Sequence, residues 1–282
     1  MPGGFHRFVG VDAHGQDAAT TELGFDEFRS AIARIAGSDF GMRDPVWLSR
    51  FGNATRQAAT YRTGRVMLAG DAAHMHFPTG GVGMNVGLQD AMNLGWKLAA
   101  VVNGVGGVGL LDSYHRERHP VGTDLLENSL AQTAVIAGVS HSGLGLRAFL
   151  NRLIGSCPEL SRTLAERLAA LHVSYPPEDP SAHAAVGRRA PNLGATDSDL
   201  FQSLRPGKPV LVSSADGPVD VDAELSVVRQ AAADGEKPDW LPVEAALIRP
   251  DGHVAWATDS AVGADEVRIA LNSMFERPTT SS

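Results

Sequence analysis

The chain has 282 residues, of which 43% are hydrophobic, and its 24 Lys and Arg against 32 Asp and Glu give a formal net charge of -8. That length and apolar content suffice for one large or two ordinary domains, the scattered charges exclude a nucleic-acid-binding face, and no apolar run reaches the roughly 18 residues of a membrane span. The single cysteine, Cys157, excludes an internal disulfide and a multi-cysteine metal site, and we expect it to be a small buried hydrophobe in a cytoplasmic, globular protein.

The first sixty residues have the pattern of a strand followed by an amphipathic helix. Residues 5–11 alternate in part, and residues 25–35 carry apolar side chains at helical spacing behind acidic residues in the first turn. Residues 46–51 and 58–61 are again strand-like.

The next segment predicts a buried strand, a glycine-rich loop and a helix. Residues 66–69 are apolar and end at Gly70 and Asp71, after which residues 78–87 are rich in glycine and a helix with regular apolar positions begins. A strand places Asp71 at its carboxyl end, where open α/β sheets bind their ligands. A carboxylate there can accept hydrogen bonds from a polyol.

The loop itself has the composition of a surface for a flat ring system. Pro78, Gly80, Gly81 and Gly83 carry no bulky side chain, so the backbone can approach a ligand closely. A helix that starts near Met84 directs free N–H groups and a partial positive charge at the same place. An isoalloxazine ring fits such a site, because its reduced form is negative near the N1–C2 carbonyl.

Residues 110–173 predict two or three packed helices, with breaks at residues 138–145 and at Cys157–Pro158. Around residues 175–180 the composition changes to Pro, Glu and Asp, which is typical of a linker.

The last part of the chain predicts a small α/β module. It contains two strands joined by a turn in which Asp-Gly provides the positive backbone angles. The predicted elements are a strand at 209–212, a helix at 227–233, strands at 245–249 and 254–256 around the turn 250–253, and a helix at 264–275.

The segment from Gly64 to Leu98 closely resembles the second FAD motif of the class A flavoprotein monooxygenases, the family of para-hydroxybenzoate hydroxylase, phenol hydroxylase and the hydroxylases of aromatic polyketide antibiotics. The matching residues are Gly70, Asp71, Pro78, Gly80, Gly81, Gly83, Asn85, Gly87, Asp90, Ala91, Asn93, Leu94, Trp96, Lys97 and Leu98.

The resemblance implies FAD as cofactor, NAD(P)H as reductant, and O2-dependent hydroxylation of a phenolic or aromatic polyketide substrate. In the family the aspartate binds the ribityl chain, and the loop with the helix start contacts the flavin ring. The implied cofactor-binding residues are Gly70, Asp71, Pro78, Gly80, Gly81, Val82, Gly83, Met84 and Asn85. It implies no catalytic side chain in this segment, and we expect no metal site.

The resemblance also implies a fold of the α/β (α+β) class: the C-terminal part of an FAD/NAD(P)-binding Rossmann-like monooxygenase fold, followed by a thioredoxin-like C-terminal domain. Without a Cys-x-x-Cys motif that domain has no redox activity of its own. The expected divisions are 1–60 for the end of the substrate-binding domain, 61–174 for the C-terminal part of the FAD-binding domain with its helical segment, 175–187 for a linker, and 188–282 for the thioredoxin-like domain.

Two motifs that precede this region in the family are expected to be missing: the Gly-x-Gly-x-x-Gly turn for the FAD pyrophosphate, and the Asp-Gly motif that serves FAD and NAD(P)H. Residues 104–109 match the first literally, but a helix and not a β-branched strand precedes them, so we interpret them as a flexible loop between helices. We therefore expect the isolated chain to bind FAD poorly. A truncated reading frame, an expressed fragment and one half of a split enzyme all remain open.

Two histidine pairs, His74 with His76 and His115 with His119, have spacings that can contribute to a zinc site. No third ligand is placed near either pair, so solvent-facing or capping histidines are the better interpretation, although His74 can border the flavin site. Residues 116–118 are interpreted as a salt-bridged helix face.

Four early aromatic residues, Phe5, Phe8, Phe25 and Trp47, either line a substrate cavity or pack in an ordinary core. Besides the monooxygenase, two other functions stay open: a non-catalytic remnant or subunit of a split flavoprotein, and a flavin-dependent dehydrogenase or halogenase, which the thioredoxin-like tail disfavours. The expected partners are an aromatic small molecule and either a missing N-terminal half or a second copy of the chain, but no nucleic acid and no membrane.

Overall fold

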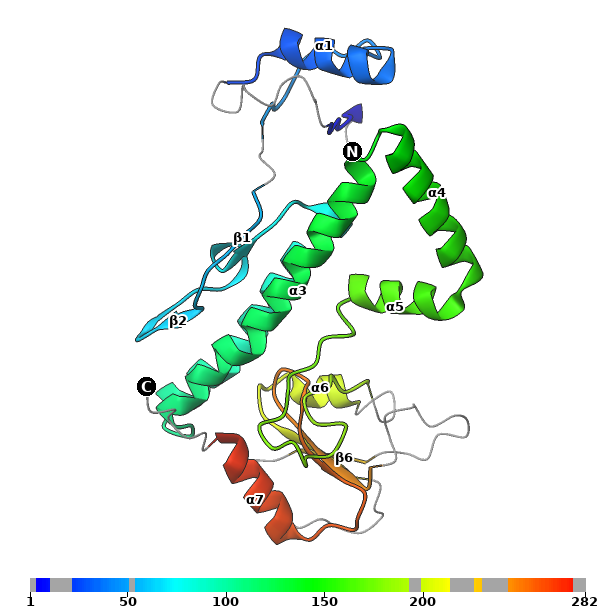
Figure 1. The fold of residues 1–282 in the computed structure, drawn as a ribbon. Helices are drawn as coiled ribbons and strands as arrows, with labels where there is room; N and C mark the ends of the chain where they lie inside the picture. Colours follow the sequence, from blue (N-terminus) through cyan, green and yellow to red (C-terminus); the bar gives the residue numbers. More distant parts are fainter. Residues whose placement is uncertain are drawn as a thin grey trace.

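The computed structural model is elongated, with helix α1 at one end, a mixed β-sheet at the other and the long helix α3 between them (Figure 1). The structure describes residues 4–10, 22–50, 54–192, 199–213, 226–229 and 243–275.

The first lobe consists of α1 (Phe25–Ala36) and extended segments on either side. Acidic residues occupy the first turn of α1, and Gly37 ends the helix with a φ of 77°. The strands predicted at 5–11 and 46–51 are wrong for the residues that the structure describes, because residues 5–10 and 46–50 are not paired as strands. Positions 11 and 51 lie outside the described residues.

Two short antiparallel ladders precede the glycine-rich loop. Strand β1 (Arg56–Gln57) pairs with β4 (His74–Met75), and β2 (Arg62–Thr63) pairs with β3 (Val66–Met67). The strand predicted at 58–61 is therefore shifted, since residues 58–61 connect β1 to β2.

The buried strand predicted at 66–69 is also wrong, because β3 pairs only with β2 among the described residues and Val66 is 65% exposed. Asp71 therefore does not follow a strand of a parallel sheet in the described part of the chain. It lies in the 3-10 turn η3 (Gly70–Ala72).

Helix α2 (Gly83–Val102) confirms the prediction of a helix after the loop and begins one residue before Met84. A turn and the 3-10 helix η5 (Val108–Leu111) follow it. The Gly-x-Gly-x-x-Gly sequence at 104–109 thus connects two helices, as its context predicts.

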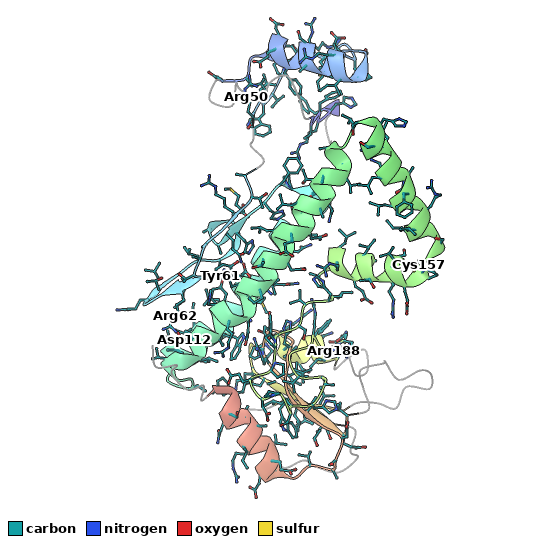
Figure 2. All side chains as sticks on the ribbon, viewed as in Figure 1. Arg50, Tyr61, Arg62, Asp112, Cys157 and Arg188 are labelled. Carbon is teal, nitrogen blue, oxygen red and sulfur yellow. The ribbon has the colours of Figure 1, made fainter. Side chains whose placement is uncertain are left out.

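Three helices follow, α3 (Asp112–Ala137), α4 (His141–Ser156) and α5 (Pro158–Leu168). The break predicted at Cys157–Pro158 is confirmed, but the one predicted at 138–145 is shorter, because α4 already begins at His141. The three helices are packed only in part: α3 buries several side chains, whereas α4 and α5 bury none. Cys157 lies at the corner between α4 and α5 (Figure 2). It is exposed, so the expectation of a buried cysteine is wrong.

The C-terminal sheet has the strand order β6-β5-β7-β8. Strands β5 and β6 are parallel, β7 is antiparallel to β5, and β8 is antiparallel to β7, which is the arrangement of a thioredoxin-like sheet. The elements are α6 (Leu200–Leu204), β5 (Val210–Ser213), β6 (Ser226–Arg229), β7 (Ala245–Ile248), β8 (Val254–Thr258) and α7 (Ala264–Phe275).

The helix predicted at 227–233 is wrong in its described part, because residues 226–229 pair with β5 as a strand. Two consecutive valines at this point favour a strand over a helix. Residues 230–233 lie outside the described residues.

One hydrophobic core joins the helices to this sheet. Trp96 of α2 and Leu110 of η5 pack with Leu211, Leu247 and other residues of the C-terminal module. The predicted linker is anchored as well, since Tyr175 is 3% exposed. Within the described ranges, no helix has the length and apolar character needed to cross a membrane.

Candidate cofactor site

The η3 turn holds Asp71 at the surface. Gly70 has a φ of 57°, and its backbone N–H donates to Asp90 Oδ2 at 3.0 Å. A Cβ on Gly87 of α2 would lie 3.3 Å from the Gly70 Cα, so the missing side chain lets the turn lie close to the helix. Asp71 is exposed and makes no hydrogen bond or ion pair with any described residue. Its carboxylate is therefore free to accept hydrogen bonds from a ligand.

Asp90 organises the interior behind this turn. It is fully buried, and besides the Gly70 N–H it contacts His74 Nε2 at 2.7 Å and accepts from Arg118 Nε at 2.7 Å. Burial alone would raise the pKa of Asp90, but the hydrogen bonds of His74 and the charge of Arg118 hold the pKa below its ordinary value. Asp90 thus remains a carboxylate that fixes the turn.

Two interpretations from the sequence are corrected by this network. His74 is 1% exposed and belongs to the interior, where its Nδ1 has no hydrogen-bond partner among the described residues, so it is not a solvent-facing histidine. Arg118 is also fully buried and donates to Tyr175 Oη and to the carbonyl of Val86. Residues 116–118 are thus all salt-bridged, as predicted, but not as one helix face, because Arg116 lies at the surface with Glu178 whereas Glu117 and Arg118 have buried partners.

The loop after β4 combines an exposed outer side with positive backbone angles. Gly80 and Gly81 have φ values of 72° and 66°, and Pro78, Gly80 and Gly81 are exposed. A Cβ on Gly81 would meet nothing within 4 Å, so the space over it is open. A Cβ on Gly80 would instead lie 3.2 Å from side-chain atoms of Gln132 and Leu168, so Gly80 faces inward.

The start of α2 leaves its first backbone donors without a side-chain cap. Met84 and Asn85 are exposed, Met84 by 76%, and the helix contributes a partial positive charge at this end. Val82 differs from its neighbours because its side chain is buried against Val86 and Leu125. Val82 can therefore reach a ligand only through its backbone.

A free carboxylate, an open glycine loop and an uncapped helix start thus lie within one short segment. A polyol fits the carboxylate, a flat ring fits the loop, and a negative carbonyl fits the helix start. The ribityl chain and the ring of a flavin combine these three features.

The outward side of α2 carries no exposed charged residue. Its two charged residues, Asp90 and Lys97, are both fully buried. Its exposed side chains include Met84, Leu88 at 58%, Met92 at 57% and Val102 at 81%. An exposed helix side without charged residues is typical of a surface that is covered by a partner.

The other end of α2 is held by a buried charged cluster, the junction network, which the sequence did not predict. Glu117 of α3 accepts from Lys97 Nζ at 2.7 Å and from Asn93 Nδ2 at 2.7 Å. It also accepts two hydrogen bonds from the guanidinium of Arg249, at 2.9 and 2.8 Å.

Asp251, in the turn between β7 and β8, completes the junction network. It accepts from Trp96 Nε1 at 3.0 Å and from Arg249 Nη2 at 2.5 Å. The guanidinium of Arg249 lies 5.2 Å from the ring centre of Trp96 and 5.1 Å from that of Tyr175. A signal for this cluster existed in the sequence: Lys97 occupies an apolar position of α2, which requires a buried partner.

Burial lowers the pKa of Lys97 to about 7, although the carboxylate of Glu117 opposes this effect. Burial would raise the pKa of Asp251, but the charge of Arg249 and the hydrogen bond of His253 hold it well below its ordinary value. The carboxylate of Asp251 therefore remains charged near neutral pH, whereas Lys97 titrates there.

The pair His115 and His119 does not form a metal site with a third ligand. The backbone N–H of Tyr61, which lies against α3 (Figure 2), donates to His115 Nδ1 at 3.2 Å. A neutral His115 that accepts at Nδ1 carries its proton on Nε2, so Nε2 has no lone pair for a metal. No group of three potential ligands occurs in the described part of the chain.

The early aromatic residues differ in their surroundings. Phe8 stacks on Phe40 with ring centres 5.8 Å apart, whereas Phe5 and Trp47 are 53% and 73% exposed. Cavity lining and core packing therefore both stay predictions for these side chains.

Comparisons with known proteins agree with this geometry. Residues 5–129 match the family model of an FAD binding domain, and residues 183–278 match that of the C-terminal region of aromatic-ring hydroxylases.

The relatives include monooxygenases about twice as long as the match. The chain is 46% identical to the uncharacterized aromatic compound monooxygenase YhjG of Bacillus subtilis over 87% of its own length and 50% of that protein. It is 40% identical to a rifampicin monooxygenase of Rhodococcus hoagii over 97% of its own length and 55% of that protein.

Among solved structures, OxyS anhydrotetracycline hydroxylase from Streptomyces rimosus superimposes with a TM-score of 0.78 at 38% identity, covering 91% of this chain and 54% of that one. The chain thus spans about half the length of the curated relatives it matches.

Proposed function

Because the chain belongs to the family of FAD-dependent aromatic-ring monooxygenases, we propose that it provides the ribityl- and ring-binding part of an enzyme that hydroxylates a phenolic or aromatic polyketide substrate. NAD(P)H is the proposed reductant and O2 the proposed oxidant. FAD, when bound, supplies the redox chemistry.

The observation that carries this proposal is the arrangement of Asp71, the loop and the helix start. The carboxylate of Asp71 has no described protein partner and is placed to accept from ribityl hydroxyl groups. The open backbone at Gly81 suits the face of the ring. The uncapped N–H groups at the start of α2 suit the N1–C2 carbonyl, where they stabilise negative charge.

The proposed cofactor-binding residues are therefore those predicted from the sequence, with distinct roles. Asp71 binds the ribityl chain, and Pro78, Gly81, Met84 and Asn85 lie on the exposed side that faces the ring. Gly70, Gly80, Val82 and Gly83 act by shaping the backbone, because their positive angles or inward contacts form the loop.

The substrate class rests on the relatives. Their names specify aromatic compounds, rifampicin and anhydrotetracycline, and each name applies to that protein alone. A phenol or an aromatic polyketide is the class that these substrates share. We also propose a cytoplasmic location, which the single cysteine supports.

A second candidate function is a non-catalytic remnant or a subunit of a split flavoprotein. The observation in its favour is the outward side of α2, which is apolar and uncharged in the described structure. In that case the partner is a polypeptide that resembles the unmatched half of the relatives, or a second copy of the chain.

The test is to purify the chain, add FAD, and measure flavin fluorescence and NADPH oxidation with phenolic substrates. The same assays are run with the unmatched half of the Bacillus subtilis relative added, and with Asp71→Asn as a matched variant. Turnover that depends on Asp71 supports the monooxygenase proposal. Flavin binding without turnover in both mixtures supports the non-catalytic alternative. No flavin binding in either mixture contradicts the monooxygenase proposal and the split-flavoprotein subunit, and leaves only the non-catalytic remnant.

A further inference from the structure

Several donors converge on one backbone carbonyl inside the proposed ring-binding loop. The segment 77–83, here called the ring loop, begins with Phe77. The Phe77 carbonyl accepts from the Thr79 N–H at 2.7 Å, from His76 Nδ1 at 2.8 Å and from Ser129 Oγ at 2.9 Å. So many donors at one carbonyl fix the position of the loop's first peptide group.

Ser129 reaches this carbonyl from α3, far along the sequence. It is 2% exposed, and its hydroxyl also lies 3.1 Å from Thr79 Oγ1. Thr79 Oγ1 in turn donates to the backbone carbonyl of Ser129 at 3.3 Å. The ring loop is therefore bonded to α3 through both the side chain and the backbone of one residue.

His76 supports the other end of the ring loop. Because a carbonyl only accepts, Nδ1 of His76 carries the proton that it donates to Phe77. The opposite ring edge then lies against the start of α2, where a Cβ on Gly83 would be 2.8 Å from His76 Nε2. Gly83 is thus needed to admit the imidazole, and His76 spans the ring loop from its first residue to its last.

We propose that Ser129 and His76 are positioning residues for the flavin ring: they hold the ring loop against α3 so that its exposed side is shaped before any cofactor binds. This inference rests on the proposed function, because it concerns the same site. Pro78, Gly80 and Gly81 are exposed, and none of them belongs to a hydrophobic core cluster of the described residues. Buried hydrogen bonds to α3 therefore take that role, and the family motif, which lies wholly in residues 70–98, does not contain Ser129.

The first measurement is hydrogen exchange of the amides of residues 77–83 in the chain without flavin. Ser129→Ala and His76→Leu remove the donors, and loss of a buried hydrogen bond is expected to accelerate exchange about fivefold to tenfold. His76→Asn keeps an N–H near the position of Nδ1 and is expected to restore protection. Thr133→Ala is the matched control, because Thr133 Oγ1 donates to the Ser129 carbonyl without bonding to the ring loop.

If Ser129→Ala does not fold, Thr79→Val tests the same contact from the loop side while it preserves the side-chain shape. Unchanged exchange in the folded variants overturns the proposal, as does equal acceleration in Thr133→Ala.

The second measurement is the affinity of the same variants for riboflavin, which carries only the ribityl chain and the ring. We expect about tenfold weaker binding for Ser129→Ala and His76→Leu, with recovery in His76→Asn. Equal affinity in all variants overturns the positioning role but leaves the proposed cofactor intact. If exchange in the ring loop is faster but the chain binds no flavin, the positioning role as stated and the proposed function are both overturned. Faster exchange together with the expected losses of affinity supports both the positioning role and the proposed function.

Discussion

The polar groups at the two ends of helix α2 differ in whether side chains of the protein bond to them. In its C-terminal half, Asn93, Trp96 and Lys97 all donate to buried carboxylates of the junction network. At its N-terminal end the backbone donors have no side-chain cap, and the nearby carboxylate of Asp71 has no described partner. The polar groups at the C-terminal end of α2, here called the closed end, are thus bonded within the protein. Those at its N-terminal end, here called the open end, have no such described side-chain partner.

This difference distinguishes polar groups that stabilise the fold from polar groups that are available to bind a ligand. A buried charge without a partner costs several kcal/mol, on the order of 3–5, so the junction network exists because every member is bonded. Polar groups that stay exposed and unbonded cost nothing while water solvates them, and they remain available to a ligand. The open end of α2 is therefore the end that we assign to the cofactor.

The largest expected effect is on the closed end. Glu117→Gln leaves two buried cations, Lys97 and Arg249, facing Asp251 alone, so we expect the free energy of unfolding to fall by about 3–5 kcal/mol. Urea denaturation measures it. The matched control is Glu178→Gln, which breaks the more exposed pair with Arg116 and should cost less than about 1 kcal/mol. Equal losses in the two variants would show that the network does not hold α2.

A pH dependence follows from Lys97. Its pKa is about 7 in the folded chain and 10.5 ordinarily, so between these values the unfolded chain binds more protons. Stability from this group therefore rises as the pH increases above 7, by about 3 kcal/mol up to pH 9.5. Unfolding curves of wild type and Lys97→Met across this range isolate the effect. A slope that is the same in both proteins would mean that Lys97 does not titrate in this window.

At the open end, Asp71→Asn should leave stability within about 0.5 kcal/mol of wild type, because the carboxylate has no described protein partner. Riboflavin affinity should nevertheless fall about tenfold, since a charged acceptor contributes on the order of 1.5–3 kcal/mol. Fluorescence titration gives the affinity. A destabilised variant with unchanged affinity would place Asp71 in the structure instead of the site.

The smallest effect concerns backbone angles. Gly81→Ala introduces a side chain at a φ of 66°, and we expect a loss of about 1 kcal/mol from the angle alone, because the space around it is open. Gly95→Ala is the counterpart in α2, where no atom is near and helix propensity should stabilise the chain by about 0.5–1 kcal/mol. Opposite signs in thermal unfolding are the expected result.

Much of the fold could be predicted because local patterns determine it. The periodicity of residues 83–102 and 264–275, and the Asp-Gly turn at 251–252, predicted their elements directly. The family motif also indicated the segment that forms the open end. Its predicted cofactor contacts remain a proposal, since they depend on a ligand.

The failures share a physical cause, which is dependence on distant partners. Residues 66–69 are apolar enough for a buried strand, but burial requires neighbouring strands, and β3 has one. Residues 226–229 pair with β5, a contact that local helical spacing does not reveal. His74 and Arg118 meet at Asp90 only in three dimensions, so their spacing in the sequence does not reveal this contact.

The central claim is that this chain holds the ribityl and ring part of the flavin site, and the most direct measurement compares riboflavin with FAD in calorimetric titrations of the purified chain. We expect weak, saturable binding of both, with affinities that agree within a factor of about two, since the proposed site contacts only the ribityl chain and the ring. Dependence on Asp71 should be the same for both ligands. FAD that binds more than about tenfold tighter than riboflavin, or riboflavin that does not bind, would contradict the account.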